Sequence, residues 1–272
     1  MTSLLTPPDH AASAYDSLAP YYDKFTAAYA HEAWIEAIES RARSFGLRGN
    51  RALDIGCGTG KSTAPLLERG YRAVGCDISE EMVERARRNL PAHAGAFRVA
   101  DMRSLPYLGE FDLVVCLDDT VNYLLNDEEL DATFAAVTAM LAPAGVFAFD
   151  VNSLATYRSS FAQAMVREID GLFFSWRGEQ VHDIAPGDLA AATVEVFAQR
   201  LDGLWERRSS RHTQRHHTPA AIRGALARSG LACCAVLGQL AGAQLESEFD
   251  EERHIKLLYF AHRADAIKTE GR

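Results

Sequence analysis

Apolar residues in the middle of the chain form short continuous runs that alternate with stretches of helical period. The run "RALDIG" at 51–56 and the run "YRAVGCDIS" at 71–79 flank a segment whose apolar positions recur every three or four residues. We predict strands at 51–56, 71–79, 94–102, 110–119 and 146–152, and helices at 60–70, 79–90 and 126–141. Because apolar strands that alternate with helices are buried on both sides, this pattern predicts an α/β fold whose mostly parallel sheet carries helices on both faces.

The pattern differs on either side of this core. Residues 1–12 are predicted to be a disordered lead-in, and residues 15–45 are predicted to be helical. Between residues 153 and 217, strand-like runs separated by glycine-containing turns predict an antiparallel meander. After it, Thr218 and Pro219 are typical of the first turn of a helix, and two further strands follow.

Composition narrows the class of protein. The chain has 272 residues, a formal net charge of −9 and five cysteines without C-x-x-C spacing, so neither a disulfide framework nor a zinc site is indicated. The excess of acidic over basic residues argues against a general nucleic-acid binder, because binding to phosphates needs a surplus of Lys and Arg. The N-terminus lacks the features of a secretory signal, and no stretch reaches the roughly 18 apolar residues of a membrane helix. We expect a cytoplasmic protein without nucleic-acid or membrane partners.

The glycine-rich segment "LDIGCGTGKST" fits two phosphate-binding motifs poorly. A P-loop that ends in Lys61 would need its first glycine at Ile55, but that glycine is Gly56. A dinucleotide loop would need its third glycine at Lys61. What remains is G-x-G-x-G directly after a strand, preceded by Asp54, which lets the backbone approach a ligand closely.

Acidic side chains end the next two predicted strands. Asp77 ends the second strand, where a carboxylate can accept hydrogen bonds from both hydroxyls of a ribose. Asp101 and Met102 end the third, which offers a carboxylate to a purine amino group and a thioether to its face. The three strand ends together suit a nucleoside without a phosphate tail.

These segments resemble the class I S-adenosylmethionine (SAM) dependent methyltransferases. The matching segments cover roughly residues 47–153, in the order "LDIGCGTG", "VGCDISEEMVERAR", "ADMRSLP", "FDLVVCLDDTVNYL" and "LAPAGVFAFDVNS". The resemblance implies SAM as cofactor and a Rossmann-like seven-stranded sheet whose last strand is antiparallel. It also implies four parts, namely an N-terminal helical lid (1–45), a SAM-binding core (46–152), an antiparallel β insertion over the acceptor (153–217), and a final helix and hairpin of the core (218–272).

The resemblance assigns residues to the cofactor. Asp77 would bind the ribose, and Tyr21 is an alternative to Tyr22 in the lid. The predicted cofactor-binding residues are Tyr15, Tyr22, Asp54, Gly56, Cys57, Gly58, Asp77, Ile78, Met82, Asp101, Met102, Leu117 and Asp118.

The acceptor site is harder to predict from the sequence than the cofactor site. Methyl transfer mainly requires alignment of the reactants, so it needs no fixed catalytic motif. Asp119 and Asn122 follow the fourth strand and are candidate catalytic residues, although an acid can also cap a helix and Asn122 can serve a turn. His217, or its neighbour His216, is a candidate proton acceptor. No carboxylate recurs at metal-ligand spacing near the cluster that includes His212, so we expect no metal.

We therefore predict methyl transfer from SAM to an N or O atom of a small molecule. The alternatives are a methyltransferase acting on protein or nucleic acid, and a SAM-binding protein without turnover. A nucleotide hydrolase or a dehydrogenase is more remote. The sequence leaves the oligomeric state open, and a homodimer is one arrangement compatible with it.

Overall fold

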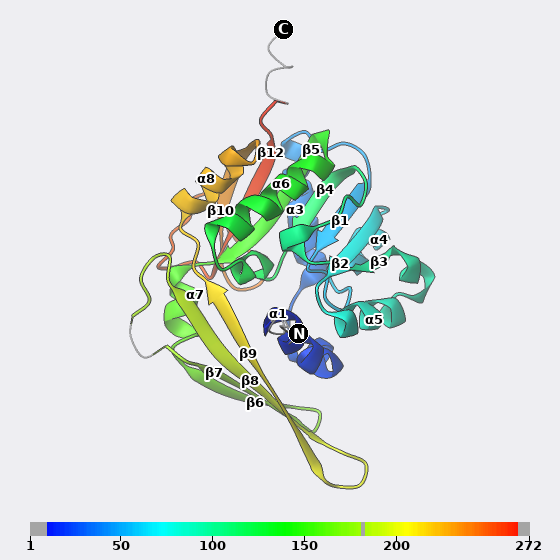
Figure 1. The fold of residues 1–272 in the computed structure, drawn as a ribbon, viewed down its shortest axis with the longest axis vertical. Helices are drawn as coiled ribbons and strands as arrows, with labels where there is room; N and C mark the ends of the chain where they lie inside the picture. The colour runs from blue at the N-terminus through cyan, green and yellow to red at the C-terminus, as the bar shows by residue number, and fades with distance from the viewer. Residues whose placement is uncertain (1–9, 181–182, 266–272) are drawn as a thin grey trace, which may run out of the picture.

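The computed structural model describes residues 10–180 and 183–265, which form two β-sheets with helices packed around them (Figure 1). The larger sheet has the strand order β11-β10-β12-β5-β4-β1-β2-β3, and the smaller has the order β6-β7-β8-β9. The strands are β1 (Arg51–Ile55), β2 (Arg72–Asp77), β3 (Phe97–Val99), β4 (Phe111–Cys116), β5 (Leu141–Asn152), β6 (Ala164–Ile169), β7 (Leu172–Gly178), β8 (Leu189–Gln199), β9 (Trp205–Arg215), β10 (Leu231–Gln239), β11 (Leu245–Glu246) and β12 (Lys256–Arg263).

The larger sheet confirms the predicted α/β fold. Strands β1, β2, β3, β4 and β5 pair in parallel, and β12 lies antiparallel between β5 and β10. An eighth strand, which we did not predict, is the two-residue β11 at the edge, held by two pairs of residues to β10. The carboxyl ends of the parallel strands meet at one edge of this sheet, where α/β proteins place their ligands.

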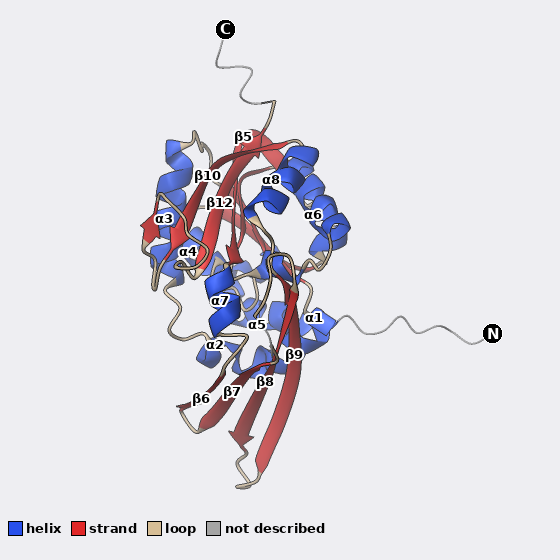
Figure 2. Ribbon diagram, turned by 90° about the vertical axis from the view of Figure 1, so that its left-hand side faces the viewer, coloured by secondary structure: helices blue, strands red, loops and turns tan. Residues whose placement is uncertain are grey.

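Helices cover both faces of the larger sheet (Figure 2). Trp34, Ile35 and Ile38 of α3 pack on one face with Leu66 of α4, so the predicted apolar stripe lies in the core. On the other face, α6 and α8 cover the aromatic side chains of β5. The α-helices are α1 (His10–Leu18), α2 (Tyr22–Phe25), α3 (His31–Ser44), α4 (Thr63–Glu68), α5 (Glu80–Asn89), α6 (Asp127–Met140), α7 (Leu154–Ser159) and α8 (Pro219–Arg228). Short 3-10 helices are η1 (Ala19–Tyr21), η2 (Pro91–Ala96), η3 (Met102–Ser104) and η4 (Thr120–Tyr123).

Helices α1 and α2 lie between the two sheets (Figures 1 and 2). Helix α1 begins at His10, so the predicted lead-in of residues 1–12 was too long at its end, while residues 1–9 lie outside the described residues. Leu18 of α1 packs with Phe174, Val194 and Val196 of the smaller sheet. This contact holds the antiparallel sheet beyond the carboxyl ends of the parallel strands, as Figure 1 shows. The predicted meander is confirmed, because its strands pair in sequence as antiparallel neighbours.

Among the described residues, no helix combines the length and hydrophobicity needed to cross a membrane.

Candidate active site

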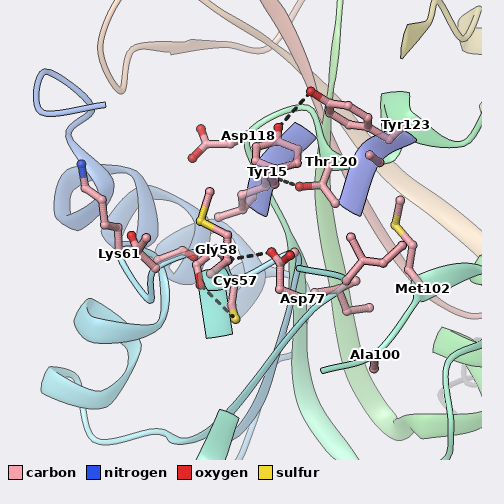
Figure 3. A pocket seen from close by; sticks show the side chains of 18 of the residues that line it. Tyr15, Cys57, Gly58, Lys61, Asp77, Ala100, Met102, Asp118, Thr120 and Tyr123 are labelled. Carbon is pink, nitrogen blue, oxygen red and sulfur yellow. Dashed lines mark hydrogen bonds between the residues drawn. The ribbon is translucent and has the colours of Figure 1, made fainter. Parts of the chain in front are cut away.

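A cavity lies at the carboxyl ends of β1, β2 and β4, with side chains of α1 and α2 on its wall (Figure 3). Every predicted cofactor-binding residue except Asp54 lines it. The lining residues are Ala11, Tyr15, Tyr22, His31, Ile55, Gly56, Cys57, Gly58, Thr59, Lys61, Ser62, Asp77, Ile78, Met82, Ala100, Asp101, Met102, Arg103, Leu117, Asp118, Thr120 and Tyr123.

The glycine loop after β1 has a backbone that side chains rarely permit. Gly56, Gly58 and Gly60 have φ angles of 72°, 51° and 87°, in the left-handed region that favours glycine. A Cβ atom on Gly56 would lie 2.5 Å from the Cγ2 atom of Thr120. The loop therefore needs glycine both for its turn and for its close contact with the segment after β4.

Asp77 is fixed at the end of β2 by two backbone amides. Its Oδ2 accepts a hydrogen bond of 2.9 Å from the N–H of Gly58, and its Oδ1 accepts one of 2.9 Å from the N–H of Ser79. Burial raises the pKa of Asp77, while these backbone hydrogen bonds act in the opposite direction. Each oxygen has a second lone pair, so the carboxylate can still accept hydrogen bonds from a ligand in the cavity.

Asp54 lies behind the loop and does not line the cavity. It is 1% exposed, and its Oδ2 accepts hydrogen bonds from the hydroxyls of Ser62 and Thr63 at 2.7 and 2.6 Å. Burial raises its pKa to about 6. The structure thus connects Asp54 to the start of α4, which supports the glycine loop from behind.

Two cationic side chains on the cavity wall are already paired. Lys61 donates to the carbonyl oxygen and the hydroxyl of Thr26, at 2.7 and 3.0 Å. The guanidinium of Arg103 forms an ion pair of 2.8 Å with Asp101. Lys61, the residue that would hold phosphates in a P-loop, thus serves the N-terminal segment, and the cavity suits a nucleoside better than a nucleotide.

The turn after β4 is strained and is held by charge. Asp118 and Asp119 have φ angles of 57° and 55°, which cost energy in residues with a Cβ atom. Lys256 of β12 lies 3.0 Å from a carboxylate oxygen of Asp119 and 3.8 Å from one of Asp118. Nε2 of His31 lies 2.7 Å from Oδ2 of Asp118. These contacts compensate the strain and aim Asp118 into the cavity.

A third carboxylate, on strand β5, stabilises the same turn. Asp150 of β5 is fully buried, lies 2.7 Å from Nζ of Lys256, and accepts a hydrogen bond of 3.0 Å from the N–H of Asp119. Burial raises the pKa of Asp150 to about 6, although Lys256 opposes that shift. Burial alone would lower the pKa of Lys256, but the carboxylates outweigh it and hold that pKa well above its usual value.

A second cavity of about 380 Å³ adjoins the first, on the side of the smaller sheet. Tyr15, Tyr22, Asp118 and Tyr123 line both cavities. A volume on this scale is typical of small-ligand pockets. Residues from α1, α2 and the smaller sheet make up much of its wall, including Leu18, Phe25, Met165, Arg167, Trp176, Val194, His212 and Gln214. The predicted catalytic residue Asp119 also lines it.

A chain of polar contacts that the sequence analysis missed runs along the boundary between the cavities. The hydroxyl of Tyr15 donates a 2.9 Å hydrogen bond to that of Tyr123, as Figure 3 shows. The Tyr123 hydroxyl lies 2.9 Å from Nδ1 of His212, whose Nε2 lies 3.0 Å from the hydroxyl of Ser210. Burial lowers the pKa of His212 to about 4, so this imidazole is neutral at pH 7.

Asn122 and His217 line neither cavity. Asn122 is fully buried, donates a 2.8 Å hydrogen bond to the carbonyl of Arg215, and accepts one of 2.9 Å from the N–H of Asn152. Nε2 of His217 lies 3.0 Å from the carbonyl of Leu124. Both side chains join the segment after β4 to the end of β9. Their geometry offers no support for a catalytic role, and they have no part in the function proposed below.

Comparisons with known proteins agree with this site. Residues 52–145 match the family described as "Methyltransferase domain". A Geobacillus sp. (strain WCH70) protein named as a methyltransferase is 28% identical, over 74% of this chain and 81% of its own. The dTDP-3-amino-3,4,6-trideoxy-alpha-D-glucopyranose N,N-dimethyltransferase of Streptomyces venezuelae is 32% identical, over 47% of this chain and 54% of its own.

A solved structure shares the fold over most of its length. The SAM-dependent methyltransferase from Clostridium acetobutylicum ATCC 824 has a TM-score of 0.77 and 23% identity, and the match covers 92% of this chain and 98% of that one. The family match and the named relatives indicate a methyltransferase that depends on SAM. The larger sheet has the class I methyltransferase fold, as the sequence motifs predicted. The residues fit this cofactor, because a carboxylate and apolar side chains line the space. Lys61 and Arg103, two cationic side chains among the described lining residues, are already paired with protein groups.

Proposed function

We propose that the protein methylates a nitrogen atom of a small molecule that binds in the second cavity. The observation that carries this proposal is that the two cavities meet, with Tyr15, Tyr22, Asp118 and Tyr123 common to both walls. A methyl group on a cofactor in the first cavity can then face an acceptor in the second. Segment 1–45 would serve as a lid, and segment 153–217 as the cap over the acceptor.

The first cavity would hold SAM through contacts specific to each part of the molecule. Asp77 would accept hydrogen bonds from the ribose hydroxyls, and Ile78 and Met102 would flank the adenine. The loop at Gly56 and Gly58 would lie against the methionine part. SAM supplies an electrophilic methyl group on a cationic sulfur, so the protein's own task is to align the acceptor and exclude water.

An amine suits the boundary between the cavities better than an alcohol. The side chains of Asp118 and Asp119 keep 20% and 26% of their surface exposed there, and tyrosine rings surround them. Carboxylates and aromatic faces attract an ammonium group. The nitrogen must lose a proton before its lone pair can attack the methyl carbon, and the carboxylate of Asp119 would accept that proton. The amino-sugar N,N-dimethyltransferase among the relatives is consistent with this class of acceptor.

The test is a screen for S-adenosylhomocysteine (SAH) production from SAM with matched pairs of small amines and their hydroxy analogues. Turnover with amines, and much less with the analogues, supports the proposal. Turnover with the hydroxy analogues alone would contradict the proposal and show that the protein methylates oxygen. Turnover only with peptides or RNA would support the macromolecular alternative, and tight SAM binding without any turnover would support a silent binding protein.

A further inference from the structure

Three carboxylates and one ammonium group meet beside the cofactor cavity. Asp118, Asp119 and Asp150 all lie within 3.8 Å of Nζ of Lys256, and we call these four residues the Lys256 cluster. With all three carboxylates ionised, the cluster has an excess negative charge. His31, which contacts Asp118, can offset only one further charge even when it is protonated.

Lys256 and Asp150 of the cluster are largely shielded from water. The side chain of Lys256 is 14% exposed and lies over the ring of Trp34, with its Nζ 5.4 Å from the ring centroid. Charges in such surroundings act on one another more strongly than charges in water. A change of one unit charge in this cluster therefore acts on any charge in the adjoining cavity.

Asp118 is the residue of the Lys256 cluster that lies where the reacting sulfur is expected. It lines both cavities, and Leu117 and Thr120 line the cofactor cavity with it. Figure 3 shows Asp118 at the wall of that cavity. On the proposed function, on which this step rests, the methyl group points from the first cavity into the second. The cationic sulfur of SAM then lies near Asp118, whereas the sulfur of SAH at that place is neutral.

We propose that the Lys256 cluster distinguishes SAM from SAH by the charge on sulfur, and that Lys256 sets the strength of this preference. The carboxylates favour the cation, so the substrate form is retained and the neutral product is held less tightly. Lys256 moderates the attraction and at the same time keeps the strained turn of Asp118 and Asp119 in place. No acceptor needs to be known to test this.

The experiment measures Kd for SAM and for SAH by titration calorimetry at pH 8, in the wild type and in two variants. Lys256→Met removes a positive charge and keeps the apolar stem, so the ratio Kd(SAH)/Kd(SAM) should rise by about four- to ten-fold. Asp118→Asn removes a negative charge and keeps the oxygen that faces His31, so the ratio should fall by about the same factor. Asp131→Asn, a carboxylate paired with Arg228 on α8, is the matched control and should leave the ratio unchanged.

Opposite shifts in the two variants are the signature of an electrostatic role, because damage to the turn alone weakens both ligands together. Ratios that stay within two-fold of the wild type overturn the inference, and so do shifts of Lys256→Met and Asp118→Asn in the same direction. If Lys256→Met does not fold, Asp119→Asn replaces it. Both carboxamide variants should then lower the ratio, and a ratio that stays unchanged or rises in either one overturns the inference. The proposed function fails separately, through the acceptor screen, and these binding ratios do not depend on that screen.

Discussion

The hydroxyl of Tyr123 lies 2.9 Å from Nδ1 of His212, which links the segment after β4 to strand β9 of the smaller sheet. Tyr15 of α1 joins the same chain through its hydroxyl. Three segments far apart in the sequence thus meet at the boundary between the two cavities. The contact ties the proposed lid and the proposed cap to the core by hydrogen bonds between half-buried tyrosine hydroxyls and the buried His212, which are costly to break.

The burial of His212 predicts a pH dependence of stability. Its pKa of about 4 in the folded protein lies below the unfolded value of about 6.5, so the unfolded state binds the proton more readily. The free energy of unfolding therefore falls as the pH drops through about 6.5 toward 4. Between pH 7 and pH 5 this residue should remove about 2 kcal/mol from the free energy of unfolding.

The measurement is urea denaturation of the wild type and of His212→Asn at pH 7 and pH 5. Asparagine can accept the hydrogen bond from Tyr123 but does not titrate. The variant should therefore lose about 2 kcal/mol less than the wild type over this range. Equal losses in the two proteins would show that His212 is not a buried neutral base.

Removal of the Asp77 carboxylate should weaken SAM binding. Asp77→Ala is expected to cost about 1.5–3 kcal/mol of binding free energy, the scale of hydrogen bonds to a charged acceptor. Because Asp77 also holds the amides of Gly58 and Ser79, urea denaturation of the same variant must show that it is folded. Unchanged SAM affinity in a folded Asp77→Ala protein would remove the ribose assignment.

The sequence predicted the parts of the site that depend on local signals at strand ends. Asp77 and the glycine loop could be placed together because carboxyl ends of parallel strands share one edge of a sheet. His31 and Lys256 could not be placed at the site from the sequence. They come from α3 and β12 and reach Asp118 only through the packing of the whole core.

The structure separates the histidines that the sequence places near one another. Alternation along the strand could indicate which histidines share a face, but it could not show which of them lies beside a cavity. His212 lines the second cavity, while His217 lies past the end of β9 and contacts Leu124. Similarly, Asp54 was predicted to bind the cofactor from its position before the glycine loop, and only its contacts with Ser62 and Thr63 show that it faces α4.

The contact between the glycine loop and Thr120 makes Gly56 intolerant of a side chain. Gly56→Ala combines a left-handed backbone with a Cβ atom 2.5 Å from the Cγ2 atom of Thr120. We expect a loss of about 2–4 kcal/mol in the free energy of unfolding, the sum of backbone strain and overpacking. The double variant Gly56→Ala/Thr120→Ala should recover the part due to the clash, and denaturation of both measures it. No recovery would mean that backbone strain dominates.

Asn122 provides the sharpest test between a structural and a catalytic role. Its amide connects Arg215 at the end of β9 with Asn152 at the end of β5, and the contact with Asn152 is buried. Asn122→Ala leaves the buried N–H of Asn152 without this partner and removes one hydrogen bond to the Arg215 carbonyl, so the free energy of unfolding should fall by about 1–3 kcal/mol. SAM affinity should stay within two-fold of the wild type, because the side chain does not line the cofactor cavity. Calorimetry and denaturation of one preparation give both numbers, and a large loss of SAM affinity without a loss of stability would return Asn122 to the binding site.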